Sequence, residues 1–202
     1  MTTFIAPVEL RRDGLLLTPL GPEHAPGLAA AAADGELWTR RYTSVPEPGQ
    51  ELAWIELALS MREAGSRLAF AVIDETTGSG SGTVLGSTSY HDLVPEIRRA
   101  EIGYTWYAAR THRTRVNTTC KLMLLEHAFE VEDCGVVGWR TSSENTISQT
   151  AIAALGAKLD GTIRRHQQAR DGGYRDTVFF SMLPDEWPAA KAALEARLAK
   201  YA

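Results

Sequence analysis

The spacing of hydrophobic residues changes along the chain, and each change of period predicts a different element. Short apolar or alternating runs cover residues 14–20, 68–73, 84–93 and 100–106, and the turn residues that bound them are typical of β-strands. The last three runs follow one another closely, which predicts a meander. The Thr, Ser and Gly residues at 76–82 predict a hairpin connection within it.

Helical spacing, with apolar residues three or four positions apart, alternates with these strands. A Pro22-Glu23 start and an alanine-rich run predict a first helix that ends at Asp34-Gly35. Four later helices are predicted from the apolar residues on one face of each: Leu52, Ile55 and Leu59; Cys120, Leu124, Ala128 and Val131; Ile147, Ala151 and Leu155; and Trp187, Ala190, Leu194 and Leu198. The helix with Leu155 stops at Gly156, where glycine can adopt a left-handed cap.

A strand at 136–141 and a final hairpin of residues 163–168 and 174–182, turning at Asp171-Gly172-Gly173, complete the predicted elements. We therefore expect an α/β fold, with a mixed central sheet of about seven strands and helices on both faces. No internal repeat and no long linker divides the sequence. Residues 1–202 are accordingly expected to form a single domain.

Composition and charge narrow the class of protein. With 44% hydrophobic and 23% charged residues, the chain is typical of a globular protein. A formal net charge of −4 argues against nucleic acid as the main partner. Neither a long apolar run nor a signal-peptide pattern appears, so we expect a cytoplasmic protein without a membrane segment. Cys120 and Cys134 are expected to be free thiols, and no Cys/His cluster has the spacing of metal ligands, so no metal is expected.

Four segments together resemble one known family. They are Glu101–Trp106, Arg110–Lys121, Asn145–Ser148 and Leu155–Ala157. In this combination they resemble the GNAT superfamily of N-acetyltransferases, and most closely the bacterial branch that includes the N-terminal acetyltransferases of ribosomal proteins. The resemblance covers nearly the whole chain. It implies the GNAT fold and acetyl-CoA as the acyl donor, but one fold can serve many acceptors.

The resemblance assigns coenzyme A binding to the loop before the long helix. The family pattern there is Gln or Arg, two residues, Gly, one residue, and then Gly or Ala. The matching residues are His112, Arg113, Thr114, Arg115, Val116 and Asn117. Three of them, His112, Arg115 and Asn117, depart from the pattern. Unpaired N–H groups at a helix N-terminus attract phosphate, and Arg110, Arg113 and Arg115 are suited to phosphate oxygens. The alternative is a solvated basic turn.

The resemblance implies further contacts to the acyl donor. A backbone N–H in the strand from Tyr104 to Trp106 would bind the thioester carbonyl. Asn145 would contact the pantetheine arm, and Ser148 would protonate the leaving thiolate. Both residues stand at the start of a predicted helix, where the alternative role is capping. Capping and contact with the acyl donor are compatible.

Attack on a thioester requires a neutral amine, so a base or a water chain must remove a proton. Glu101 is the first candidate because it lies on the strand beside the expected cleft, followed by His91 and Asp92, and then by Glu96. An ion pair between strands is the alternative for Glu101. Capping of a turn is the alternative for His91 and Asp92.

The acceptor pocket is expected to use Trp38, Arg41, Tyr42 and Trp106, which offer aromatic walls and a positive charge. Large aromatic side chains also fill protein cores, which is the alternative. If Arg41 faces the pocket, an acceptor with a carboxylate or phosphate is expected.

Three functions remain open from the sequence. The first is transfer of an acetyl or short acyl group from coenzyme A to a primary amine of a small molecule or a protein N-terminus, by direct attack in a ternary complex. The second is a GNAT-fold binding module that no longer accepts coenzyme A. The third is aminoacyl transfer from charged tRNA, in which Arg164 and Arg165 would join the loop arginines in holding RNA phosphates. The acceptor and the oligomeric state, a homodimer included, are left open.

Overall fold

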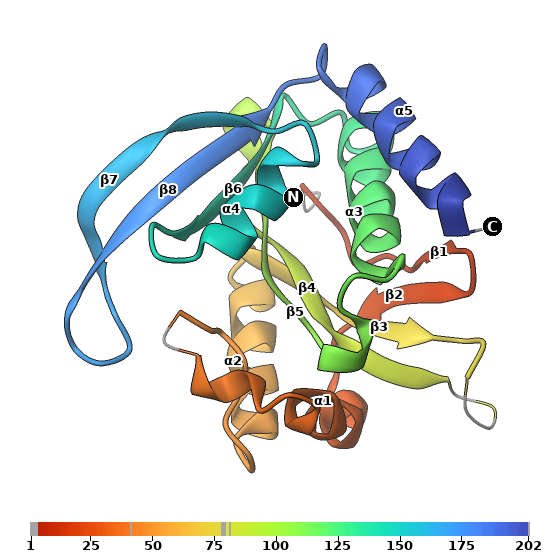
Figure 1. The fold of residues 1–202 in the computed structure, drawn as a ribbon, viewed down its shortest axis with the longest axis vertical. Helices are drawn as coiled ribbons and strands as arrows, with labels where there is room; N and C mark the ends of the chain where they lie inside the picture. Colours follow the sequence, from red (N-terminus) through yellow and green to blue (C-terminus); the bar gives the residue numbers. More distant parts are fainter. Residues whose placement is uncertain (1–3, 41, 78–79, 81, 202) are drawn as a thin grey trace.

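The structure is a computed structural model that describes residues 4–40, 42–77, 80 and 82–201. Eight strands in these residues form one sheet, in the order β1-β2-β3-β4-β5-β6-β8-β7 (Figure 1). Neighbouring strands are antiparallel except β5 and β6, which run parallel. The strands are β1 (Leu10–Arg12), β2 (Leu15–Pro19), β3 (Arg67–Asp74), β4 (Thr83–Val94), β5 (Arg99–Tyr107), β6 (Val136–Ser142), β7 (Lys158–Gln168) and β8 (Tyr174–Met182).

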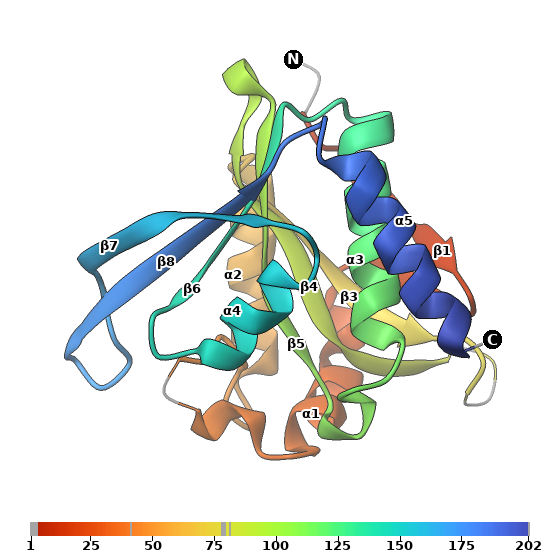
Figure 2. The same cartoon turned by 45° about the horizontal axis from the view of Figure 1, so that its top comes forward.

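Helices cover both faces of this sheet. Helices α1 and α2 pack on one face, against β4 and β3, while α3 and α5 pack together on the other (Figures 1 and 2). Helix α4 lies beside β6 and β8. The α-helices of the described residues are α1 (Ala25–Ala33), α2 (Glu51–Glu63), α3 (Val116–Glu126), α4 (Thr146–Ala153) and α5 (Trp187–Leu198).

Two hydrophobic cores lie on the two faces of the sheet. Successive residues of a strand point to opposite faces. In β3, Phe70 therefore joins the core under α3 and α5, while Ala71 joins the core under α1 and α2. As expected, the apolar face of α5 is buried in the core under α3 and α5, and Ile55 of α2 is buried in the core under α1 and α2. The expected α/β fold, with helices on both faces of a mixed sheet, is confirmed.

Several expectations need correction. The sheet has eight strands rather than about seven, because the three-residue β1 is too short to produce a periodic signal. Val131 is 70% exposed, since the backbone of residues 127–131 widens into a π-helical turn and rotates it outward. Leu52 is also exposed. Strand β7 begins at Lys158, five residues before the expected start. In the hairpin connection, residues 78, 79 and 81 lie outside the described residues.

Strand β5 contains a bulge in the middle of the sheet. Ser87 of β4 pairs with Trp106 and Ser89 pairs with Gly103, so β5 carries one more residue than β4 over this stretch. Within it, Tyr104 has a φ of 50°, which is uncommon for a residue with a side chain. A bulge bends its strand and changes the direction of nearby groups. Here it lies where β5 turns away from β6.

Strands β5 and β6 pair over only three residues. Their register joins Arg99 to Val136, Ala100 to Val137, and Glu101 to Gly138. Beyond these pairs β5 continues to Tyr107 and β6 continues to Ser142 without further pairing to each other. The two strands therefore part within the sheet and leave a gap between them (Figure 2).

A glycine in β4 permits the close approach of β5 at the bulge. Gly86, with a φ of 153°, pairs with Tyr107, and an added Cβ would clash with the carbonyl oxygen of Trp106 and lie 2.9 Å from the Tyr107 Cα. Gly161 in β7 has nearly the same φ, 158°, but has open space around it. An added side chain would strain the backbone angle at both glycines but would clash only at Gly86, so a comparison of the two isolates the cost of the clash.

We predict that Gly86→Ala lowers the free energy of unfolding by about 2–4 kcal/mol, because the backbone of β5 must move. Gly161→Ala, the matched control, should cost only about 1–2 kcal/mol, because it carries the strain of the backbone angle without the clash. Urea denaturation of both variants measures the difference. Equal losses in the two variants would show that the close approach at Gly86 does not constrain the sheet.

Candidate functional site

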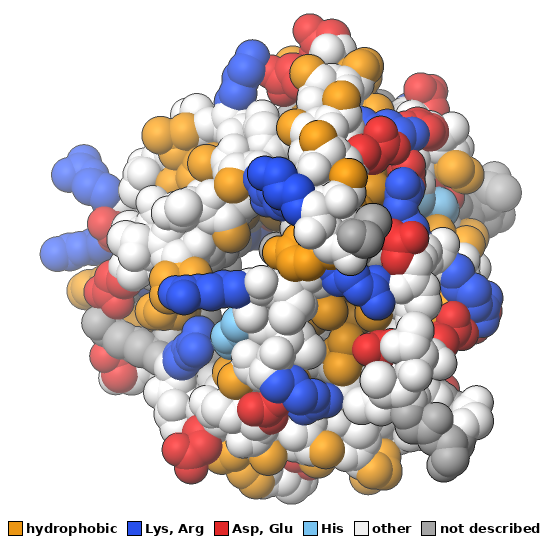
Figure 3. Space-filling view, turned by 45° about the vertical axis from the view of Figure 1, so that its right-hand side comes forward, with side chains coloured by type: hydrophobic (Ala, Val, Ile, Leu, Met, Phe, Trp, Pro, Cys, Tyr) orange, Lys and Arg blue, Asp and Glu red, His pale blue; other side chains and the backbone are white. Residues whose placement is uncertain are grey.

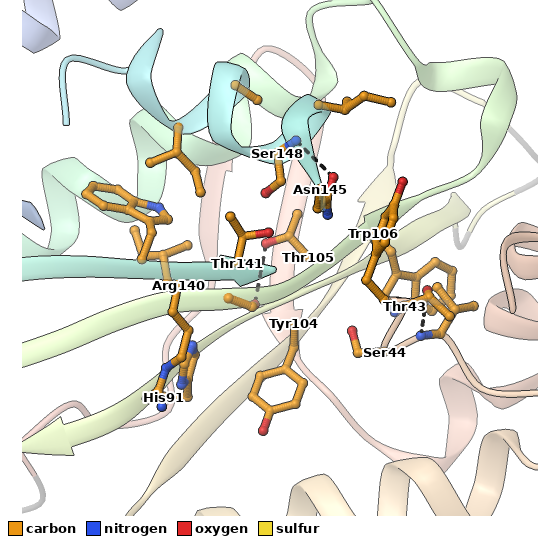
Figure 4. A pocket seen from close by; sticks show the side chains of 18 of the residues that line it. Thr43, Ser44, His91, Tyr104, Thr105, Trp106, Arg140, Thr141, Asn145 and Ser148 are labelled. Carbon is orange, nitrogen blue, oxygen red and sulfur yellow. Dashed lines mark hydrogen bonds between the residues drawn. The ribbon is translucent and has the colours of Figure 1, made fainter. Parts of the chain in front are cut away.

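A cavity of about 630 Å³ lies at the gap between β5 and β6. Its walls come from both strands, from the first two turns of α3, from α4, and from the loop between α1 and α2 (Figure 4). In the space-filling view, Lys and Arg side chains border a hollow on that face of the molecule (Figure 3). A cavity of this size and position is suited to an elongated small ligand.

The edges of the gap are made of backbone. Beyond Glu101 and Gly138 the N–H and C=O groups that β5 and β6 turn toward each other are not paired between the strands. At the far ends, the carbonyls of Tyr107 and Ser142 already meet side chains of the chain itself. Buried backbone polar groups need hydrogen-bonding partners. A ligand with amide groups, laid along the gap, can supply them in the manner of an added strand.

The bulge at Tyr104 is held in place by packing. The Tyr104 ring points to the α2 side, away from Thr105 (Figure 4), and the guanidinium carbon of Arg67 lies 3.8 Å from the ring centroid. The His91 ring packs edge-on, with 5.1 Å between centroids. Arg67 is fully buried and donates from Nε to Ser89 Oγ at 3.0 Å. Burial lowers the pKa of Arg67 to about 10, so the guanidinium keeps its charge and its cation–π contact at neutral pH.

The first candidate base is engaged in ion pairs. Glu101 is fully buried, accepts from Arg140 Nε at 2.6 Å, and also pairs with Arg99. Burial raises the pKa of Glu101, while the two arginines oppose that shift. Its carboxylate does not line the cavity. The interpretation as an ion pair between strands is therefore confirmed, and the role of Glu101 as a base that meets the substrate is not supported by this geometry.

His91 and Asp92 both line the cavity. His91 lies beside Arg140 (Figure 4), and Asp92 pairs with Arg140 at 3.1 Å. Burial, and then Arg140, lower the pKa of His91 to about 3, which leaves the imidazole neutral and weakly basic at pH 7. Burial raises the pKa of Asp92, but Arg140 and Arg99 together outweigh it, and the net pKa is lowered. Glu96 is exposed in a turn outside the cavity.

The start of α4 forms the opposite wall. Asn145 caps the helix, with Oδ1 accepting from the Ser148 N–H at 3.1 Å. Both side chains line the cavity above Thr105 and Thr141 (Figure 4). Capping is confirmed, and it leaves the Ser148 hydroxyl facing the cavity. Ile147, expected on the buried face of this helix, is mostly exposed at the cavity rim.

The arginines of the loop before α3 differ in their contacts. Arg110 pairs with Asp34 at 2.9 Å, and Arg115 donates to the Asp13 carbonyl at 2.6 Å. Arg113 is exposed, and among the described residues its guanidinium has no recorded partner. At the N-terminus of α3, the N-cap residue Arg115 makes no side-chain cap. Thr114 Oγ1 accepts from the Val116 N–H at 3.3 Å, and the N–H groups that follow in the first turn of α3 are left for an external acceptor.

The loop places backbone strain at a different residue from the one expected. Arg115 occupies the glycine position of the family pattern but has a φ of −64°, which any residue adopts. Arg113 instead has a φ of 62°, in the left-handed region. Of the six loop residues, His112 and Asn117 line the cavity. His112 Nε2 lies 3.0 Å from the Tyr107 carbonyl.

The proposed acceptor residues are divided by the structure. Tyr42 and Trp106 line the cavity, together with Thr43 and Ser44 of the same loop (Figure 4). Trp38 packs against the core under α1 and α2 instead of lining the cavity, so the core alternative holds for it. Arg41 lies outside the described residues.

Several residues of the cavity or its support have no signal in a motif or a period. Arg67 begins a buried strand, and Lys121 interrupts an apolar helix. The only hint that the sequence gives of either residue is a charge within an apolar run. Arg140, Thr141 and Arg175 also line the cavity. Only their three-dimensional position reveals them.

The cysteines and acidic residues offer no other chemistry in this region. Burial raises the pKa of Cys120 and of Cys134 to about 12, so neither thiol supplies a thiolate at neutral pH. Across residues 4–40, 42–77, 80 and 82–201, no group of His, Cys, Asp or Glu side chains is arranged to hold a metal ion. In the same ranges, no helix has the length and apolarity needed to cross a membrane.

The chain is similar to proposed acetyltransferases of known sequence or structure. The Bacillus subtilis (strain 168) protein "Putative ribosomal N-acetyltransferase YdaF" is 30% identical over 115 residues, which are 54% of this chain and 59% of that protein. The chain thus matches less than two thirds of the length of this curated relative. A solved "putative acetyltransferase" from T. thermophilus is 31% identical, with 96% of this chain and 98% of that chain covered and a TM-score of 0.80.

A more distant solved structure shares the fold. Mycobacterium smegmatis RimJ, in complex with CoA-disulfide, is 19% identical, with 95% of this chain and 93% of that chain covered and a TM-score of 0.75. Residues 14–158 match the family described as "Acetyltransferase (GNAT) domain". This match includes every strand and helix around the cavity except β8 and the greater part of β7. The chain therefore belongs to the GNAT acetyltransferase family.

Proposed function

We propose that the chain, as a single domain of residues 1–202, transfers an acetyl or short acyl group from coenzyme A to a primary amine by direct attack in a ternary complex. The observation that carries this proposal is the gap between β5 and β6, with the N-terminus of α3, which only the Thr114 hydroxyl caps, at one end. The pantetheine arm contains two amides that can pair with the strand edges. The pyrophosphate can accept from the N–H groups of α3.

Relatives support this choice of donor. Mycobacterium smegmatis RimJ shares the fold and was solved with a coenzyme A derivative. In this chain, the thioester would lie between the β5 bulge and α4, where Asn145 and Ser148 face Thr105 and Thr141. A backbone N–H near Tyr104 would bind the carbonyl oxygen as it gains charge during attack. The Ser148 hydroxyl would donate a hydrogen bond to the leaving sulfur.

The amine would enter beside Tyr42 and Trp106, from the α1–α2 loop. Because Glu101 is held by two arginines and the pKa of His91 is near 3, we propose that the amine proton leaves through water held in the cavity, with His91 as one acceptor of its hydrogen bonds. The acceptor remains a small-molecule amine or a protein N-terminus, and the curated relative favours the second. The cytoplasmic location remains a prediction, and the oligomeric state stays open.

The test of this proposal is calorimetric titration with acetyl-CoA, followed by a thiol-release assay with candidate amines and peptides. We expect one-to-one binding with a dissociation constant between about 1 μM and 1 mM. Release of thiol should require an amine, because attack is direct. No binding at millimolar acetyl-CoA would favour a binding module without this cofactor. A salt-sensitive shift with charged tRNA would favour aminoacyl transfer.

We predict that Ser148→Ala lowers kcat by about 100-fold with an identified amine, because the leaving sulfur loses a hydrogen-bond donor. The helix cap survives, since it uses the backbone N–H of Ser148. Thr150→Ala, an exposed position on the same helix outside the cavity, should leave kcat within about twofold of the wild type. An unchanged kcat in Ser148→Ala would remove this residue from the reaction.

We predict that Arg113→Asn weakens acetyl-CoA binding by about threefold to tenfold, because its free guanidinium is placed to meet phosphate. Asn accepts the left-handed backbone of this position, so stability should be retained. The loss should shrink at high salt. Arg164→Asn, on exposed β7, is the control and should bind normally. Equal affinities of both variants would assign phosphate binding to the α3 backbone alone.

A further inference from the structure

One buried charge in the cavity lies outside the chemistry described so far. Lys121 lies in α3, one turn after Asn117 and on the same side of the helix, and both residues line the cavity. Its side chain is only 5% exposed. Lysine is almost never fully buried without a partner of opposite charge. The contacts of this ammonium group therefore bear on which ligand group it binds.

The partners of Lys121 are neutral hydroxyls. Its Nζ donates to Thr105 Oγ1 at 2.8 Å and to Thr88 Oγ1 at 3.4 Å, and the two hydroxyl oxygens are 2.8 Å apart. An ammonium has three N–H donors. For the third, the part of the chain that the structure describes offers no recorded acceptor, and no recorded carboxylate pairs with Lys121. The group is thus desolvated, positively charged and incompletely satisfied.

The charge of Lys121 persists under ordinary conditions. Burial lowers its pKa to about 8, with Cys120 acting weakly in the opposite direction, so most molecules carry the ammonium at pH 7. The titratable group that acts on this pKa is Cys120, and burial raises the pKa of its thiol, which is therefore neutral at pH 7. Arg140 and Arg175 also line the cavity, but it is the Lys121 ammonium that donates to Thr105. An anion beside Thr105 would therefore meet the Lys121 charge, which among the described residues has no recorded carboxylate to offset it.

The position of this charge within the cavity is set by its partner Thr105. Thr105 immediately follows the strained Tyr104 of the β5 bulge, and its side chain points toward Thr141 and Ser148 on the facing wall (Figure 4). This is the place proposed for the thioester. During transfer, the group that becomes negative there and remains negative after the bond breaks is the sulfur of coenzyme A.

We propose that Lys121 is the positive charge that stabilises the coenzyme A thiolate as it leaves. The inference rests on the proposed function. The amine nitrogen forms a bond to the carbonyl carbon, the carbon–sulfur bond breaks, and its electron pair stays on sulfur beside the Lys121 ammonium. The amine proton passes to water, and the thiolate is later protonated by solvent. A preorganised charge of this kind acts on the transition state and the product more than on the neutral thioester.

A purely structural role makes a different prediction. If Lys121 only filled space, an apolar side chain of similar length would serve as well or better, since replacing buried charge by apolar groups is often neutral or stabilising. Lys121→Met should then fold with an unchanged or higher melting temperature. If Lys121 instead stabilises the thiolate, the folded Lys121→Met protein should no longer distinguish a thiolate from an uncharged group beside Thr105.

The experiment compares coenzyme A with desulfo-coenzyme A, which lacks the sulfur, by calorimetric titration at pH 7.5. We expect the wild type to bind coenzyme A at least about tenfold more tightly than the desulfo analogue. In Lys121→Met the ratio of the two affinities should fall to about threefold or less, the part that the Ser148 hydroxyl can supply, while acetyl-CoA affinity stays within about threefold of the wild type and kcat falls about 100-fold. Lys158→Met, an exposed lysine on β7, should retain the wild-type ratio.

Two results would overturn the inference while leaving the proposed function intact. One is a wild-type protein that binds acetyl-CoA but binds coenzyme A and its desulfo analogue equally. The other is a folded Lys121→Met protein that weakens acetyl-CoA and coenzyme A to the same extent, which would assign Lys121 to ground-state binding. Failure of the wild type to bind acetyl-CoA at all would instead contradict the proposed function. The wild-type ratio needs no variant, so the test does not depend on the folding of Lys121→Met.

Discussion

The short parallel pairing between β5 and β6 is the constraint on which the site depends. Three residue pairs hold the strands together, and beyond them the twisted sheet opens. The chain passes from one strand to the other through α3, and a crossover of this kind packs its helix against the sheet. One end of α3 therefore lies beside the opening, and α4 follows directly from the end of β6. Backbone donors, a helix N-terminus and a polar wall converge because α3 and α4 both begin beside this opening.

Buried charges define where the strands part. Glu101 pairs with Gly138 in the last register pair between β5 and β6, and Arg140 follows Gly138 two residues later in β6. Their ion pair, with Arg99, joins the two strands at the vertex of the gap. Asp92 pairs with the same two arginines, so the four charges form one network and each keeps a partner of opposite sign. Glu101 is thus explained by architecture, and the Arg67 contact to Tyr104 stabilises the adjacent bulge in a similar way.

The sequence predicts the fold better than it predicts the chemistry of the site. Periodicity identifies β3 and α5 because burial on regular faces produces that period. It misses β1, which is too short, and misplaces Val131, because a π-helical turn breaks the 3.6-residue period. A motif identifies Asn145 and Ser148, since capping and ligand contact both favour these residue types. Lys121 ends one of the segments that resemble the family, but no motif assigns it a role, because that role depends on two threonines that are 33 and 16 positions away in the chain.

The edges of the gap receive the acyl donor in this account of the site. Hydrogen–deuterium exchange of the backbone amides, measured with and without acetyl-CoA, tests it most directly, because protection reports new hydrogen bonds residue by residue. The account predicts added protection at residues 102–107 of β5, 139–142 of β6 and the first turn of α3. Protection confined to the β7–β8 hairpin, or no change along β5 and β6 in a protein saturated with acetyl-CoA, would contradict it.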